Sequence, residues 1–306
     1  MKPIFNLTRL ATLALLFSIT LIISCEKELS SDPQEEVAAA QISSEADAES
    51  EIVFNEVFDN VMGVNNDVGL AGVGVFGQVA TSGIGEPARV MACPNITISH
   101  SNAPNVFPVK IEMDFGTGCT GRDGRVRSGK IVSVYTNRLI VPGAKATTTF
   151  VDFKIDSIKV QGTHVITNLN IATSQNYIHK WKVVVEGAKL TKPNGNYTEW
   201  NTTKTITQIE GSATISLPLD DIYKIEGSGS GKVKRGDRLV LWRAEITEPL
   251  IKKFTCHWLV KGTLKVVREN LSNSSIYAAT LNYGAGTCDN KAVVTVNGIA
   301  HEITLP

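Results

Sequence analysis

The residues best suited to acid–base chemistry are five histidines, and they are scattered along the sequence. The sequence contains no G-x-S-x-G motif, which exposes a serine nucleophile, and no H-E-x-x-H motif, which places two histidine ligands around zinc. Because a catalytic triad is defined by geometry and not by sequence order, a hydrolase stays open as an alternative. We expect no enzyme activity and no cofactor, with surface or sheet-edge positions for His100, His164, His179, His257 and His301.

Two charged clusters could bind ions. Asp220 and Asp221 follow Pro218, and such a turn could hold calcium, although a solvated acidic turn is the commoner outcome. The second cluster either grips an anionic glycan or lipid headgroup or forms a solvated turn of neutralising pairs. It comprises Arg122, Asp123, Arg125, Arg127 and Lys130. No C-x-x-C spacing occurs, so we expect no metal site.

Aromatic side chains are the features most suited to ligand binding. On one open face of a sheet they would stack on sugar rings or line an apolar groove. Filling of a β core is the competing interpretation. The candidate ligand-binding residues are Trp181, Tyr197, Trp200 and Trp242.

The N-terminus has the features of a processing signal. Lys2 and Arg9 precede an uncharged, mostly apolar stretch that is too short to span a bilayer comfortably. It ends in Ile22-Ile23-Ser24-Cys25, which resembles the lipobox of bacterial lipoproteins. That resemblance implies cleavage of residues 1–24, lipidation of Cys25, and membrane attachment through the lipid.

The mature chain has no charge bias. Cleavage would remove Lys2 and Arg9 and no acidic residue, so a chain with 30 basic and 30 acidic residues stays nearly neutral. Phosphate binding needs a concentrated basic face, and we therefore exclude nucleic acid as a partner. In an oxidising compartment, the four cysteines that remain after Cys25 predict two disulfides. They are Cys93, Cys119, Cys256 and Cys288.

The region before the cysteines divides into three parts. Residues 25–44 lack an apolar period and are predicted to form a disordered tether. Residues 45–65 begin with acidic side chains and carry an apolar stripe at helical spacing, which predicts an amphipathic helix packed on its own domain. A partner-binding helix is the alternative. Residues 66–92 form a glycine-rich connector without the signature of a phosphate loop.

Residues 93–306 alternate between apolar and polar positions, with turn residues at short intervals, as in Asn297-Gly298. This pattern predicts an all-β domain in which a long antiparallel meander forms a curled sheet or a sandwich. Five short glycine repeats indicate bulges where the sheet bends. They centre on Gly162, Gly187, Gly211, Gly227 and Gly262.

A longer repeat joins the two ends of the β region. Asp114-Phe-Gly-Thr-Gly-Cys119 matches Asn282-Tyr-Gly-Ala-Gly-Thr-Cys288 with one insertion, and each block has a cysteine upstream. Among three possible connectivities we therefore expect Cys93–Cys119 and Cys256–Cys288.

The same two blocks resemble a group of Bacteroidota envelope lipoproteins. This resemblance implies an outer-membrane address and supplies no catalytic residues. Periplasmic and cell-surface display stay open. We expect a lipid-anchored, non-enzymatic binding or structural domain whose ligand is a glycan, lipid or protein. A periplasmic carrier of a lipid or other apolar ligand is the first alternative, and a hydrolase the second.

Overall fold

The computed structural model describes residues 32–63, 94–100, 107–121, 123–171, 178–214 and 218–306. The predicted signal peptide, the connector 66–92, Cys25 and Cys93 lie outside these ranges. The chain divides into two compact units, Met1–Glu36 and Val37–Pro306, and the second holds the sheet and most of the helix. None of the described helical segments is sufficiently long and apolar to cross a membrane.

The described residues form one long α-helix, one short 3-10 helix and fourteen strands. In chain order they are α2 (Pro33–Met62), β1 (Asn95–His100), β2 (Val109–Asp114), β3 (Cys119–Thr120), β4 (Val126–Tyr135), β5 (Lys145–Ile155), β6 (Ile158–Asn168), β7 (Lys180–Thr191), β8 (Tyr197–Glu210), η2 (Pro218–Asp220), β9 (Ile222–Arg235), β10 (Arg238–Lys253), β11 (Lys261–Arg268), β12 (Ala279–Ala285), β13 (Lys291–Val296) and β14 (Ile299–Thr304).

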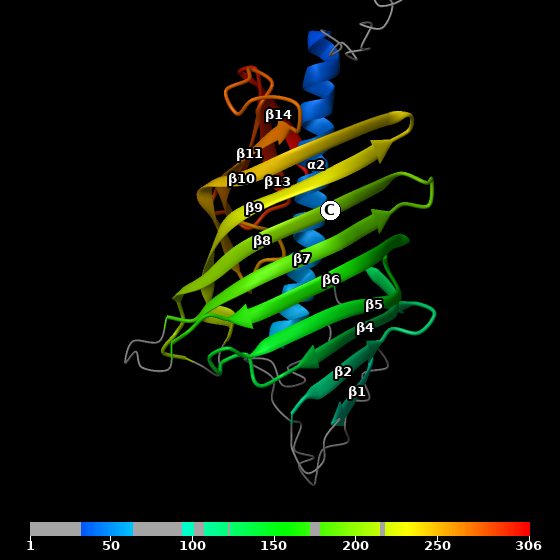
Figure 1. Cartoon of the computed structure of the whole chain (residues 1–306), viewed down its shortest axis with the longest axis vertical. Helices are drawn as coiled ribbons and strands as arrows, with labels where there is room; N and C mark the ends of the chain where they lie inside the picture. Colours follow the sequence, from blue (N-terminus) through cyan, green and yellow to red (C-terminus); the bar gives the residue numbers. More distant parts are fainter. Residues whose placement is uncertain (1–31, 64–93, 101–106, 122, 172–177, 215–217) are drawn as a thin grey trace, which may run out of the picture. The chain divides into compact units, whose positions relative to one another are not determined.

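A single antiparallel sheet contains all of these strands. Each strand pairs with the next strand in sequence, except that β2 pairs with β4 and not with β3. The two-residue β3 pairs only with β4. The order runs from β1 to β14 without closing, and Figure 1 shows the central strands side by side. The predicted meander is confirmed, and it forms one curled sheet instead of a sandwich.

Four of the five glycine repeats lie where the strand pairing shifts register, as predicted, whereas Gly211 follows the end of β8. The shift between β6 and β7 falls at Gly162, and the shift between β7 and β8 surrounds Gly187. Gly162 has a φ of 121°, and a Cβ there would lie 2.7 Å from the Cα of Ala188. Any other residue at this position would meet both backbone strain and a backbone clash. The bulges let long strands bend around the interior.

Helix α2 is longer than the sequence pattern predicts. It begins at Pro33, so residues 33–44 are helical and do not belong to a disordered tether. It ends at Met62 and not at residue 65. Asp32 caps its start, because its Oδ1 accepts a hydrogen bond 2.9 Å long from the Gln34 amide. Alanine and glutamate are frequent in the added segment, and both favour helix over an open chain.

The helix lies in the concavity of the sheet, and it is buried around its circumference and not along one stripe alone. From residue 46 to residue 62 every side chain except Asp59 is buried. Phe54 shows the packing: its ring centroid lies 6.0 Å from that of Phe150 on β5 and 5.6 Å from that of Trp200 on β8. Figure 1 shows α2 crossing behind the central strands. A sheet that curls around a helix buries faces that an amphipathic helix would leave in water.

Buried serines of the helix satisfy their hydrogen bonds within it, and a tyrosine of the sheet bonds to its last turn. The hydroxyl groups of Ser44 and Ser50 donate to carbonyl oxygens one turn earlier, at 2.8 Å and 2.9 Å. Tyr135 of β4 donates from its hydroxyl to the Val61 carbonyl near the end of the helix, at 2.9 Å. These bonds remove the penalty that an unpaired buried hydroxyl would impose.

One expected disulfide is confirmed, between Cys256 and Cys288. Cys119 is also disulfide-bonded, while Cys93, its expected partner, lies outside the described residues. The two long repeats share a turn. The Gly116 amide donates to Asp114 Oδ1 at 2.9 Å, and the Gly284 amide donates to Asn282 Oδ1 at 2.7 Å. The repeated Asp or Asn therefore sets the same backbone turn before each cysteine.

Candidate functional site

The three candidate tryptophans do not form an exposed ligand platform. Trp181, Trp200 and Trp242 are 0%, 2% and 1% exposed. The Trp181 indole N–H donates to the Leu139 carbonyl at 3.0 Å. The other two indoles donate to Asp47 Oδ1 on α2, at 2.9 Å and 3.2 Å. Their role is to fill the space around the helix, and the aromatic-strip prediction is wrong for all three.

Tyr197 lies on the opposite, outer face of the sheet, but its ring is not free for a sugar. The ammonium group of Lys189 lies 4.3 Å from the ring centroid, and that of Lys232 lies 5.9 Å away. Both lysines also pair with Glu199, at 3.1 Å and 2.7 Å. The tyrosine thus supports a local cluster of charges.

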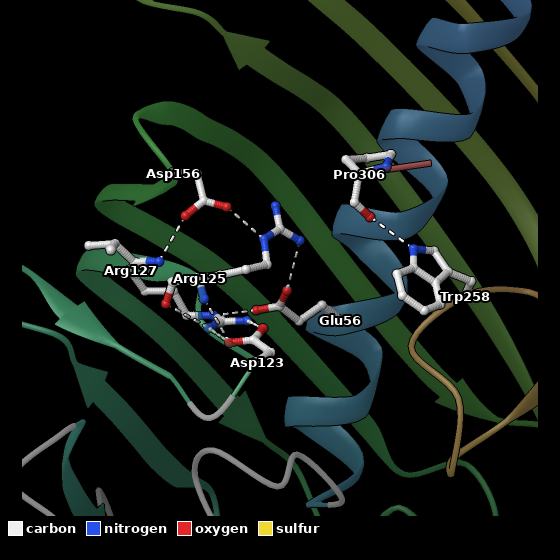
Figure 2. A network of polar contacts seen from close by, with 8 residues as sticks. Glu56, Asp123, Arg125, Arg127, Asp156, Trp258 and Pro306 are labelled. Atoms are coloured by element: carbon white, nitrogen blue, oxygen red, sulfur yellow. Dashed lines mark hydrogen bonds and ion pairs between the residues drawn. The ribbon is translucent and has the colours of Figure 1, made fainter. Parts of the chain in front are cut away.

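Two arginines of the charged segment after Cys119 reach Glu56 of α2 and anchor the helix (Figure 2). Arg127 is buried and contacts Glu56 of α2 and Asp123, each at 2.6 Å. Arg125 contacts Asp156 at 2.8 Å and Glu56 at 3.7 Å. Although burial opposes the charge, the hydrogen bonds to Asp123 and Glu56 raise the pKa of Arg127. The predicted neutralising pairs exist. Arg127 is buried against the helix instead of solvated, whereas Lys130 pairs with Glu112 and Asp114 at a partly exposed position. Arg122 lies outside the described residues.

Asp221 is likewise not part of a solvated acidic turn. It is 1% exposed and accepts hydrogen bonds from Gln208 Nε2 at 2.7 Å and from the Tyr223 hydroxyl at 2.8 Å. Asp220 accepts a bond from the Thr214 hydroxyl at 2.6 Å. Within the described residues, no group of three or more His, Cys, Asp or Glu side chains has the arrangement of a metal site.

Acidic residues of α2 are matched by donors from many strands. Together they hold the helix to both halves of the sheet, with the following partners: Asp47 with Trp200 and Trp242, Glu49 with Lys192 and Arg235, Glu51 with Lys204, Glu56 with Arg125 and Arg127, and Asp59 with Lys252. Breaking any one buried pair would leave an uncompensated charge, which is costly. The concave face is therefore occupied by the chain's own helix.

The outer face carries a groove of about 880 Å³ across β7 to β11. Its floor is formed by Ser228, Gly229 and Ser230, the middle of the Gly-Ser-Gly-Ser-Gly segment 227–231 of β9. The side chains of Ser228 and Ser230 face outward. Because they are small, the surface is recessed at these two positions. The glycines face the helix side, where a Cβ at Gly231 would lie 2.4 Å from the Trp242 ring. The same segment thus admits bulky indoles inside and leaves a depression outside.

Strand register places the mostly polar, outward side chains of the groove in two rows. The first row runs Val184, Thr203, Ser228, Glu245 and Lys265, each opposite the next across the sheet. The second row runs Asn201, Ser230, Arg243 and Val267. At the usual strand spacing the first row, which crosses five strands, is about 19 Å long, and the second, which crosses four, is about 14 Å long.

Arg243 builds one wall of the groove. Its guanidinium donates to the Leu271 carbonyl at 2.6 Å, to the Glu269 carbonyl at 3.0 Å and to Asn273 Oδ1 at 2.8 Å. These bonds hold the loop after β11 over the end of the groove. Four charged side chains line the groove, and none of them forms an ion pair with another described residue. They are Arg243, Lys265, Glu186 and Glu245. The groove thus presents cations and anions that do not neutralise one another directly.

The groove could not be predicted from the sequence. Its floor depends on two serines, and its rows are made by residues from five strands that only the register brings together. The alternating Gly-Ser segment was the one available hint, because it lacks any large side chain on either face. Comparison with family models, curated proteins and solved structures found no match to the chain.

Proposed function

We propose that this chain is a lipid-anchored protein of the bacterial outer envelope and that its β domain is a non-enzymatic binding module. The lipobox-like Ile22-Ile23-Ser24-Cys25 supports the anchor. The Cys256–Cys288 disulfide agrees with an oxidising compartment, where such bonds persist. Attachment by lipid leaves the β domain in water with its outer face available.

The groove on the outer face is the observation that supports the binding role. It combines outward hydroxyls from Thr203, Ser228 and Ser230 with charged side chains that lack ion-pair partners in the described structure. Hydroxyl, amide and charged groups in a row suit a ligand that itself carries many hydroxyls. We therefore propose an envelope oligosaccharide as the ligand.

The carrier alternative has less support from the geometry. A lipid carrier needs an open concavity lined with aliphatic side chains. In the described structure the concave face holds α2, and Val53, Val57 and Phe58 of the helix fill its apolar centre. The outer groove contains more polar than aliphatic side chains. For this reason we propose the glycan ligand and not the lipid.

A groove-filling variant tests the proposal. Ser230 is exposed on the groove floor, and Ser230→Trp would place an indole across both rows. Thr149→Trp is the matched control, because Thr149 is exposed on the outer face of β5 and lies outside the groove. The full chain in detergent would be screened against oligosaccharides released from capsule and lipopolysaccharide.

We expect the wild type and Thr149→Trp to bind the same oligosaccharide, and Ser230→Trp to lose at least tenfold in affinity with unchanged melting. Equal binding by all three proteins would place the ligand elsewhere. Failure of the wild type to bind any member of the panel would contradict the glycan assignment.

A further inference from the structure

A buried lysine and a buried glutamate meet between the helix and the central strand. Lys204 lies on β8 with its side chain turned toward the helix, and Glu51 lies on α2. The Lys204 ammonium nitrogen contacts Glu51 Oε2, and the side chains are 6% and 3% exposed. The second carboxylate oxygen, Oε1, accepts a hydrogen bond from Asn55 Nδ2 at 3.2 Å.

A second carboxylate completes the cluster. Asp47 lies one helical turn before Glu51, so the two share a face of α2. Trp200 and Trp242 fix its Oδ1 by their indole hydrogen bonds, and the Lys204 nitrogen lies 4.8 Å from the Trp200 ring centroid. Asp47, Lys204 and Trp200 line one small internal void, and its described walls leave no space for a water molecule.

Burial shifts Lys204 and Asp47 toward their uncharged forms. Burial lowers the pKa of Lys204 to about 8, although Asp47 acts in the opposite direction. Burial also raises the pKa of Asp47 above its ordinary value, against the lowering effects of Lys204 and the two indoles. A neutral amine is a nucleophile, and a protonated carboxyl can pass its proton to a leaving group.

We propose that Lys204 and Glu51 condense to an intramolecular isopeptide bond, with Asp47 as the group that carries the proton. The lone pair of Lys204 Nζ forms a bond to Cδ of Glu51, and the Cδ–Oε2 bond breaks. Both protons lost by the ammonium nitrogen end on Oε2, which leaves as water. Oε1 stays as the amide oxygen, where Asn55 stabilises it. The step involves no oxidant, reductant or co-reactant.

The contact between the two groups and the exclusion of water from their surroundings favour formation of the bond. Groups held in contact by a fold react as if at effective concentrations of about 10⁵–10⁸ M. The void beside Lys204 has no room for a water molecule, which opposes the reverse hydrolysis. Joining the pair also removes two buried charges, whose desolvation a salt bridge offsets only in part. The bond would tie α2 covalently to β8, at the middle of the sheet and under the groove.

Another buried lysine serves as an internal comparison. Lys252 lies 2.9 Å from Asp59 at the far end of the helix. The Asp59 side chain is 21% exposed, so water reaches this pair. We expect Lys252 and Asp59 to stay an ordinary salt bridge.

Peptide mapping of the full-length protein tests the proposal. After denaturation and trypsin digestion, uncrosslinked protein yields residues 28–89 and residues 190–204 as separate peptides, because cleavage follows Lys189 and Lys204. The bond would block cleavage after Lys204 and join residues 28–89 to residues 190–224. The branched peptide would weigh one water molecule less than its two parts. None of these peptides contains a cysteine.

Three variants separate the roles. Glu51→Gln should form the same branched peptide with the same mass, because ammonia leaves in place of water. Asp47→Asn should lose at least tenfold in the crosslinked fraction, whereas the control Asp59→Asn should keep the wild-type fraction. Separate peptides from the wild type, with cleavage after Lys204, would overturn the proposal. Full crosslinking in Asp47→Asn would overturn the role given to Asp47.

Discussion

His164 makes the stability of the fold depend on pH. The side chain is 1% exposed on β6, and its ring stacks on Phe54 with the centroids 6.3 Å apart. Neither ring nitrogen has a hydrogen-bond partner among the described residues. Burial lowers the pKa of His164 to about 3. The fold therefore accepts the neutral imidazole and excludes the charged one.

The sign and size of the effect follow from linkage. An unfolded histidine titrates near pH 6.5, so the contribution of His164 to stability is fully present above that pH. It is lost as the pH falls from 6.5 toward 3, because only the unfolded chain then takes up the proton. Between pH 7 and pH 5 the loss amounts to about 2 kcal/mol.

Urea unfolding of the wild type and His164→Phe at these two pH values measures the effect. Phenylalanine is of similar size and does not titrate. We expect the wild type to lose about 2 kcal/mol more than the variant on going from pH 7 to pH 5. His100, exposed on edge strand β1, provides the control position. Equal losses in the wild type and His164→Phe would refute the reasoning.

Three further substitutions test the packing around the helix. Cys288→Ala should leave a free Cys256 thiol that titrates once the protein is unfolded, and lower the free energy of unfolding by about 3–4 kcal/mol, because the bridge closes a long loop. Arg127→Met should cost about 3–5 kcal/mol in urea unfolding, since it leaves Glu56 buried without this partner, and adding Glu56→Gln should recover much of that loss. Trp200→Phe should cost about 1 kcal/mol by removing one of two donors to Asp47. A second substitution that adds to the cost of Arg127→Met, or a Cys256 thiol that stays unreactive in unfolded Cys288→Ala, would contradict these assignments.

The sheet could be predicted from the sequence because each of its determinants is local. Alternation of apolar and polar residues predicts the strands, and Asn297-Gly298 has the positive φ angles, 50° and 77°, of the expected hairpin turn. The glycine repeats predict the bulges for the same reason. Each of these signals lies within a few residues of the structure that it specifies.

The helix length and the roles of the tryptophans could not be predicted because they depend on distant partners. The sequence around Trp200 is polar, and this favoured an exposed ring. Thr202 and Lys204 are polar yet face inward, since the helix brings Asp47 and Glu51 to meet that face. A helix enclosed by a sheet needs no single apolar stripe, so its first half lacks the apolar periodicity that predicts a helix, although its composition favours one.

Anchoring through Cys25 underlies the whole proposed function, and metabolic labelling tests it most directly. Cells that express the full chain or Cys25→Ala would be grown with a labelled fatty acid and separated into soluble and membrane fractions. We predict that the full chain takes up label and sediments with the outer membrane, while Cys25→Ala takes up none and is released. A full chain without label, or equal membrane retention of both proteins, would contradict the lipid anchor.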